Sequence, residues 1–174
     1  MRHTRFGDAE CPVAQSLDVI GEWWSLLILR DALDGASRFD QFARNLAIPP
    51  ATLTRRLRAL VAEGLLTTRR YQDHPPRDEY VPTERGRSLL PVIVALQMWG
   101  ERDRGPDERV LQLVDAVSGA TLDPVLVDRT SGRLLSDVDA VFRPGPAASA
   151  GMRERFEALA PGVGGADREP VRPS

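Results

Sequence analysis

Apolar residues recur at helical spacing through the N-terminal half of the chain. They predict short helices over 12–21, 23–33 and 38–46. The segment 23–33 is apolar on most sides, so we expect it to form the central helix of the core. Its two tryptophans, together with Trp99, could line a pocket for an aromatic ligand, but core packing is the preferred interpretation.

A fourth predicted helix, over 50–63, has two chemically different faces. Leu53, Leu57 and Leu60 recur on one side of it. The opposite side carries small, hydroxyl-bearing or basic side chains and no acidic ones: Ala51, Thr52, Arg55, Arg58 and Ala59. Two helices joined by a short turn, with such a face on the second, are typical of a helix-turn-helix that enters a DNA groove.

A strand pair with a proline-rich tip is predicted after this helix. The strands cover 65–71 and 79–82, and the tip covers 72–78. Two consecutive prolines in the tip cannot continue a strand ladder and therefore stiffen the loop. His74 and Arg77 flank them, so the tip suits contact with a phosphate or a minor groove. The order of elements is that of a helix-turn-helix followed by a β-wing.

The remaining segments complete the predicted fold. A long helix over 83–99 has more apolar surface than a small domain buries alone, which indicates a partner chain. Segment 123–136 alternates like a hairpin that turns at Ser131 and Gly132. The predicted fold class is α+β: a mainly helical winged helix-turn-helix with a β-wing, plus a small C-terminal β-hairpin extension.

Three segments are expected along the chain. Residues 1–105 form the DNA-binding and dimerisation domain, and residues 106–143 form the extension with its hairpin. Residues 144–174 are expected to be a largely disordered tail, because Pro, Gly and Ala dominate it apart from a short stretch at 153–159.

The charge distribution modifies this picture more than the net charge does. A net charge of −2 over 174 residues argues weakly against nucleic-acid binding. However, residues 44–88 hold nine arginines and five acidic residues, a net of +4, whereas residues 101–174 hold ten and thirteen, a net of −3. Every basic residue is arginine, a bias that a GC-rich genome explains more simply than function does.

Several classes of protein are excluded by composition. The single cysteine, Cys11, excludes a disulfide within the chain and a cysteine-rich zinc site. Paired carboxylates, nucleophile–base pairs and phosphate-binding glycine loops are missing, so we expect no enzyme, metal or cofactor. A membrane-spanning run of roughly 20 apolar residues is missing, as is a signal peptide, so a cytoplasmic protein is the default.

Cys11 itself has two interpretations. It lies just before Pro12 at a predicted helix start, where the helix dipole stabilises a thiolate, so it could be a redox sensor. The preferred alternative is a small buried residue at a dimer interface. Without a second cysteine in the chain, a sensor would need a bridge between two copies, a mixed disulfide or a sulfenic acid.

Four motifs carry a family resemblance, and they lie between Cys11 and Gly100: CPVAQSLDVIGEWWSLLILRDAL, RFDQFARNL, TLTRRLRALVAEGLL and PPRDEYVPTERGRSLLPVI. With these motifs the chain resembles the HxlR-type winged-helix transcriptional regulators, relatives of the MarR group. The resemblance implies a homodimer, formed through N- and C-terminal helices, that binds pseudo-palindromic double-stranded DNA. Some members respond to electrophiles or oxidants, and some use a cysteine in the region of Cys11.

The extension resembles that of longer family members, in which cysteines in a CG…CxxCG arrangement often lie on a hairpin. Here Ser118 and Gly119, and then Asp128, Ser131 and Gly132, occupy the corresponding places. Neither Ser nor Asp replaces a thiolate in a structural zinc site, so the hairpin is predicted to be metal-free.

The combined evidence predicts a transcriptional regulator that places helix 50–63 in a major groove and the wing 72–78 alongside it. The predicted DNA-binding residues are Ala51, Thr52, Arg55, Arg58, His74 and Arg77. Arg56 lies nearer the buried edge and could form a structural ion pair. The alternative function is a winged-helix module that binds protein rather than DNA, and a small-molecule effector between subunits is a third hypothesis.

Overall fold

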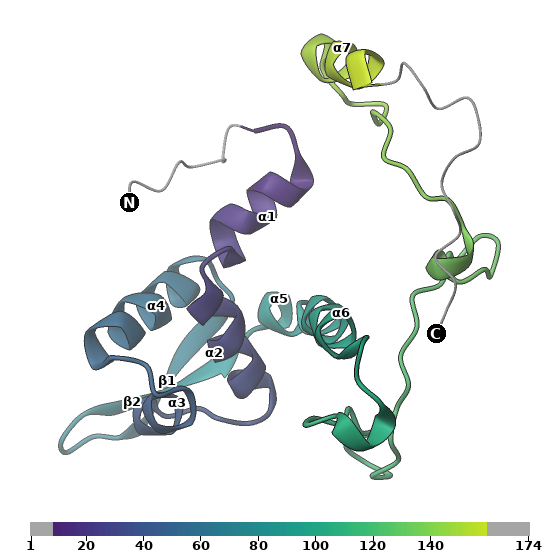
Figure 1. Ribbon diagram of the computed structural model, residues 1–174. Helices are drawn as coiled ribbons and strands as arrows, with labels where there is room; N and C mark the ends of the chain where they lie inside the picture. The colour runs from purple at the N-terminus through teal and green to yellow at the C-terminus, as the bar shows by residue number, and fades with distance from the viewer. Residues whose placement is uncertain (1–8, 160–174) are drawn as a thin grey trace. The chain divides into compact units, whose positions relative to one another are not determined.

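The computed structural model describes residues 9–159 (Figure 1). Its elements in chain order are α1 (Pro12–Ile20), α2 (Trp23–Leu33), α3 (Phe39–Leu46), α4 (Pro50–Ala62), β1 (Leu66–Gln72), β2 (Arg77–Pro82), α5 (Glu84–Arg87), α6 (Leu90–Glu101), the 3-10 turns η1 (Pro106–Glu108) and η2 (Leu135–Asp137), and α7 (Ala150–Leu159). Two compact units divide between Val125 and Leu126. The functional boundaries expected after residues 105 and 143 stay a prediction.

Helix α2 is the centre of the first unit, as predicted, because it contacts α1, α3, α4, α6 and β2. The buried apolar residues come from one face of each neighbouring element: Ile20, Ile28, Leu29, Ala32, Phe42, Ile48, Leu53, Leu57, Leu60, Leu65 and Leu66. Trp24 packs against this core. The core interpretation is wrong for Trp23 and Trp99, whose exposed fractions are 76% and 72%.

The start of helix α3 is capped by the side chain of Gln41. The side-chain carbonyl of Gln41 accepts hydrogen bonds from the backbone N–H groups of Ser37 and Arg38, at 2.9 and 2.8 Å. Arg38 is the N-cap residue, and the Ser37 hydroxyl bonds to Glu79 instead of capping the helix. At its other end, Ala47 adopts a left-handed conformation with φ of 49°, which ends α3 and turns the chain towards α4.

The wing is an antiparallel strand pair, as predicted, although the first strand is shifted by one residue and the second begins two residues earlier. The register runs from Leu66 opposite Pro82 to Gln72 opposite Arg77, with an irregularity at Tyr71. Arg77 therefore belongs to the second strand, and the unpaired tip shortens to 73–76. These helices and the wing confirm the predicted winged helix-turn-helix.

The long helix predicted over 83–99 is two helices, α5 and α6, separated at Ser88 and Leu89. Pro91 lies in the first turn of α6. Proline has no N–H to bond to the preceding turn, so it fits a helix start and not the interior of a helix begun at residue 84. Within α5, Gly86 lies so close to the Leu65 carbonyl oxygen that a Cβ would stand 2.1 Å from it. Only glycine fits there.

The hairpin predicted over 123–136 is not confirmed, because these residues form no strand in the structure. Among the residues described, the extension has two tight turns, each with one isolated bridge: Val114 with Thr121, and Val127 with Leu134. Both turns have the sequence Leu-Val-Asp-x-x-Ser-Gly-x-x-Leu, at 113–122 and again at 126–135. Residues 138–142 likewise form no strand.

The side chain of an aspartate organises each turn. In the first, Asp115 Oδ1 accepts hydrogen bonds from the Ser118 N–H at 2.6 Å, the Ser118 hydroxyl at 2.8 Å and the Val117 N–H at 3.0 Å. These bonds, the Ser118 N–H above all, hold the pKa of Asp115 below its usual range. Gly119 then takes φ of 72°, a left-handed conformation that favours glycine.

The second turn repeats the arrangement with Asp128. Its carboxylate accepts from the Ser131 hydroxyl at 2.5 Å and from the N–H groups of Ser131 and Thr130 at 2.9 and 3.3 Å. The Ser131 hydroxyl is the main cause of a lowered Asp128 pKa. Each aspartate carboxylate therefore bonds to residues of its own turn.

The disordered tail expected over 144–174 stays a prediction. Helix α7 extends from Ala150 to Leu159 and includes the short stretch recognised at 153–159. The rest of the predicted disordered tail, 160–174, lies outside the described residues.

Candidate nucleic-acid interface

Helix α4 separates a packed face from an exposed one. Leu53, Leu57 and Leu60 are fully or almost fully buried against the core. On the other side Ala51, Arg55, Arg58 and Ala59 are exposed, and Thr52 is half-buried. Pro50 in the first turn costs no hydrogen bond, because that N–H would have no helical partner.

Arg55 and Arg58 differ from the arginine between them. Neither has a side-chain hydrogen bond or ion pair with any residue that the structure describes. Arg56, by contrast, forms a 2.8 Å ion pair with Glu22 at the start of α2, and both side chains are largely buried. The predicted structural role of Arg56 is thus confirmed, and two guanidinium groups are left unpaired on the outer face.

The wing carries more arginines, but most are neutralised. Arg69 Nε bonds to Glu79 Oε1 at 2.5 Å, and Arg70 Nε bonds to Asp78 Oδ1 at 2.6 Å. Each of these two arginines is therefore paired with a carboxylate across the strands. Arg77 is exposed at the start of β2, and no side-chain bond of it is found in the described chain.

His74 is exposed in the tip of the wing. Its backbone carbonyl accepts a hydrogen bond from the Gln72 side chain at 3.0 Å, which closes the tip. His74 and Arg77 therefore lie at the same end of the wing, as predicted, while Ala51, Thr52, Arg55 and Arg58 lie together on α4.

Sequence reasoning missed two residues where the wing joins the helices, Arg38 and Glu79. The Arg38 guanidinium stacks over the Tyr71 ring at 4.6 Å from its centroid. Glu79 bonds to Arg69 and also accepts from the Ser37 hydroxyl at 3.2 Å. The Arg69 bond is the main cause that lowers the pKa of Glu79, with Ser37 and Arg38 contributing. These contacts join segments far apart in sequence, so no local pattern indicates them.

Cys11 is the N-cap residue of α1, as predicted, and is a free, half-buried thiol. Within residues 9–159, no three His, Cys, Asp or Glu residues approach one another closely enough to hold a metal ion. The described helices include none with the length and apolar character to cross a membrane.

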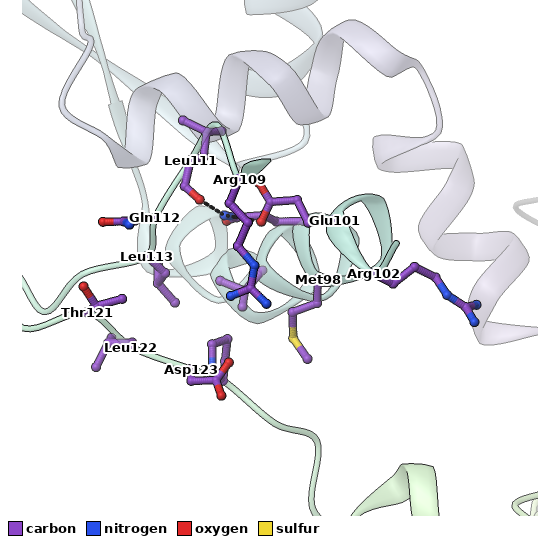
Figure 2. Close-up of a pocket in the computed structure, with 13 residues that line it drawn as sticks. Met98, Glu101, Arg102, Arg109, Leu111, Gln112, Leu113, Thr121, Leu122 and Asp123 are labelled. Carbon is purple, nitrogen blue, oxygen red and sulfur yellow. Dashed lines mark hydrogen bonds between the residues drawn. The ribbon is translucent and has the colours of Figure 1, made fainter. Parts of the chain in front are cut away.

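A hollow of about 340 Å³ lies between α6 and the segment 109–124 (Figure 2). Its lining includes charged groups of both signs, among them Arg109 and Asp123, and the thioether of Met98. Gln97 Nε2 donates to the Leu111 carbonyl at 3.2 Å, which holds the segment against the helix.

Comparisons with known proteins agree with this geometry. Residues 19–108 match the model of the HxlR-like helix-turn-helix family. The chain is 41% identical over 138 residues to Rv3095 of Mycobacterium tuberculosis (strain H37Rv), an uncharacterised HTH-type transcriptional regulator, covering 77% of this chain and 85% of that one.

Solved structures include two similar proteins of different length. PA1607, described as a candidate transcription factor, has a TM-score of 0.71 and 37% identity, covering 82% of this chain and 100% of that one. The redox regulator HypR in its oxidised form has a TM-score of 0.50 and 40% identity, covering 55% and 99%. These relatives are named as regulators and not as enzymes. The chain belongs to the HxlR-like helix-turn-helix family of transcriptional regulators.

Proposed function

We propose that the protein acts as a homodimer that binds a pseudo-palindromic operator, with α4 in the major groove and the wing tip alongside it. Half-sites would lie about one helical turn apart. The observation that carries the proposal is the pair of unpaired guanidinium groups, Arg55 and Arg58, on the exposed face of α4. Each good bidentate contact to guanine would contribute about 1–3 kcal/mol of discrimination.

Exposed apolar helices support the homodimer. Within the described chain α6 has no buried residue, although it is rich in apolar side chains. Its large exposed apolar residues are Leu90, Val92, Leu96 and Trp99, and α1 adds Val13 and Leu17. Two helices with this much apolar surface favour burial against a second copy.

The DNA proposal is tested with genomic fragments selected by the purified protein. The affinity should fall steeply with salt, because phosphate contacts release counterions. Arg55→Ala with Arg58→Ala should weaken binding and flatten the salt slope by about 2. The matched control, Arg104→Ala with Arg129→Ala, removes two exposed arginines elsewhere.

The proposal would be contradicted if the Arg55/Arg58 variant and the Arg104/Arg129 control both bound DNA with the affinity of the parent protein. It would favour the alternative, a winged-helix module that binds protein.

The homodimer is tested by sedimentation at several concentrations. Leu96→Asp with Trp99→Asp places two charges on the apolar face of α6 and should yield monomers. Val117→Asp is the control, because Val117 is 97% exposed in a turn of the extension. A dimer that survives the α6 changes would place the interface elsewhere.

A redox response through Cys11 is a second proposal, supported by the half-buried thiol at the start of α1 and by the similarity to the redox regulator HypR. Oxidant should reduce operator affinity in the parent protein and leave Cys11→Ser unaffected. Equal responses of the two proteins would end this idea. A small-molecule effector is testable by thermal shift with a metabolite panel, the hollow beside α6 being the candidate site.

A further inference from the structure

A cluster of three side chains joins the wing to the helix-turn-helix; we name Ser37, Arg69 and Glu79 the stem cluster. The two carboxylate oxygens of Glu79 have different partners. One accepts from Arg69 Nε on β1 at 2.5 Å, and the other accepts from the Ser37 hydroxyl before α3 at 3.2 Å. A single carboxylate thus bonds to a strand of the wing and to the start of α3.

The backbone reinforces the same junction. The Tyr80 N–H donates to the Ser37 carbonyl at 2.7 Å. Arg38, the next residue, stacks over Tyr71 of β1. Gln41 holds the N–H groups of Ser37 and Arg38, so the segment that receives the wing is itself tied to α3.

The adjacent ion pair shows what is special about Glu79. Arg70 and Asp78 form a cross-strand pair of similar length, 2.6 Å, one position nearer the tip. That pair stays within the wing, and its side chains are 51% and 42% exposed. The Glu79 side chain is only 13% exposed. Asp78 therefore offers a matched control with the same charge and strand but no bond to α3.

We propose that Glu79 is a positioning residue that holds the wing in one direction relative to α4, so that wing tip and recognition helix contact the same DNA together. The inference rests on the proposed DNA binding. Glu79 itself touches no DNA in this scheme; it acts through Ser37 and Arg69. Loss of the stem cluster would leave the strand pair formed while the wing changes direction on its base.

The direction of the wing is measurable without DNA. Spin labels on Asp73→Cys at the tip and Asn45→Cys in α3, in a Cys11→Ser background, report a distance distribution by double electron–electron resonance. Dilution with unlabelled protein removes distances between subunits. Glu79→Gln and Ser37→Ala should broaden the distribution about twofold, whereas Asp78→Asn should leave it narrow. An unchanged width in both stem variants would overturn the proposal, whatever the protein binds.

The consequence for DNA is tested on a fragment selected by the parent protein. Glu79→Gln should weaken binding about fivefold, and Asp78→Asn less than about twofold, although both remove one negative charge. Arg77→Ala should weaken the parent and Asp78→Asn proteins equally, and Glu79→Gln much less, because a displaced wing has little contact left to lose. Circular dichroism establishes that each variant is folded.

Equal losses for Glu79→Gln and Asp78→Asn, or an undiminished Arg77→Ala effect in the Glu79→Gln protein, would contradict the inference. Failure of the parent protein to select any DNA would instead contradict the proposed function.

Discussion

The outer face of α4 and strand β1 of the wing each carry two closely spaced arginines, but only those of the wing have side-chain partners. Arg55 and Arg58 on α4 have no side-chain partner in the described chain. Arg69 and Arg70 in the wing are each bonded to a carboxylate of β2. The number of arginines in a segment is therefore a poor guide to a DNA-binding surface, because pairing decides which charges remain available.

The largest effect is expected from the packed side of α4. Leu57→Ala removes a fully buried side chain and should lower the free energy of unfolding by about 2–5 kcal/mol. Arg58→Ala, on the exposed side, should change it by less than about 0.5 kcal/mol. Urea unfolding measures both. Similar losses for the two variants would mean that the faces are not divided as described.

Operator affinity separates the two arginine pairs. Arg55→Ala should cost about 1–3 kcal/mol of binding free energy, because an unpaired guanidinium is free to contact a base or phosphate. Arg70→Ala should cost less than that, since its charge is already matched by Asp78. Fluorescence anisotropy at constant salt gives both values. A larger loss for Arg70→Ala would reverse the comparison.

The ion pair between Arg70 and Asp78 should contribute little to protein stability. Arg70 and Asp78 are both more than a third exposed, so Arg70→Ala should lower the free energy of unfolding by at most about 0.5 kcal/mol. Thermal unfolding in low and high salt is the measurement. A loss of several kcal/mol would contradict the expectation that this exposed ion pair contributes little.

A fall in pH should destabilise the stem cluster before it destabilises α4. Since the folded pKa of Glu79 lies below its ordinary value of 4.5, its contribution to stability is complete above that value. The contribution is lost as pH falls through the lowered folded pKa. The protection of the β2 amides, taken relative to the intrinsic exchange rate at each pH, should therefore fall below pH 4.5 and not between pH 7 and 5. If the Glu79→Gln protein shows no such change at low pH, Glu79 is identified as the titrating group.

Local patterns predicted helix α4 and the wing because these elements depend on short-range chemistry. The leucine spacing of α4 determines which side is buried, and Arg56 lies at the edge where an ion pair with α2 is possible. The tandem prolines of the tip and Gly64 at the end of α4 are equally local signals.

The errors come from competition between local and distant partners. Ser37 suits a helix cap, but Glu79 in the wing takes its hydroxyl and Gln41 caps the helix instead. Alternation over 123–136 resembles a hairpin, yet Asp128 closes a tight turn by bonding its own neighbours. Trp23 and Trp99 lie in apolar helices that the sequence pattern assigns to the core, yet both side chains are exposed in the described chain.

The repeated turn of the extension has a consequence for how such chains can change. Each copy completes its hydrogen bonds within ten residues, through Asp115 and Ser118 or through Asp128 and Ser131. Neither copy needs the other to form. Each turn should therefore form from its own ten residues, so a chain that loses the second copy, which belongs to the second unit, would keep the first copy beside α6.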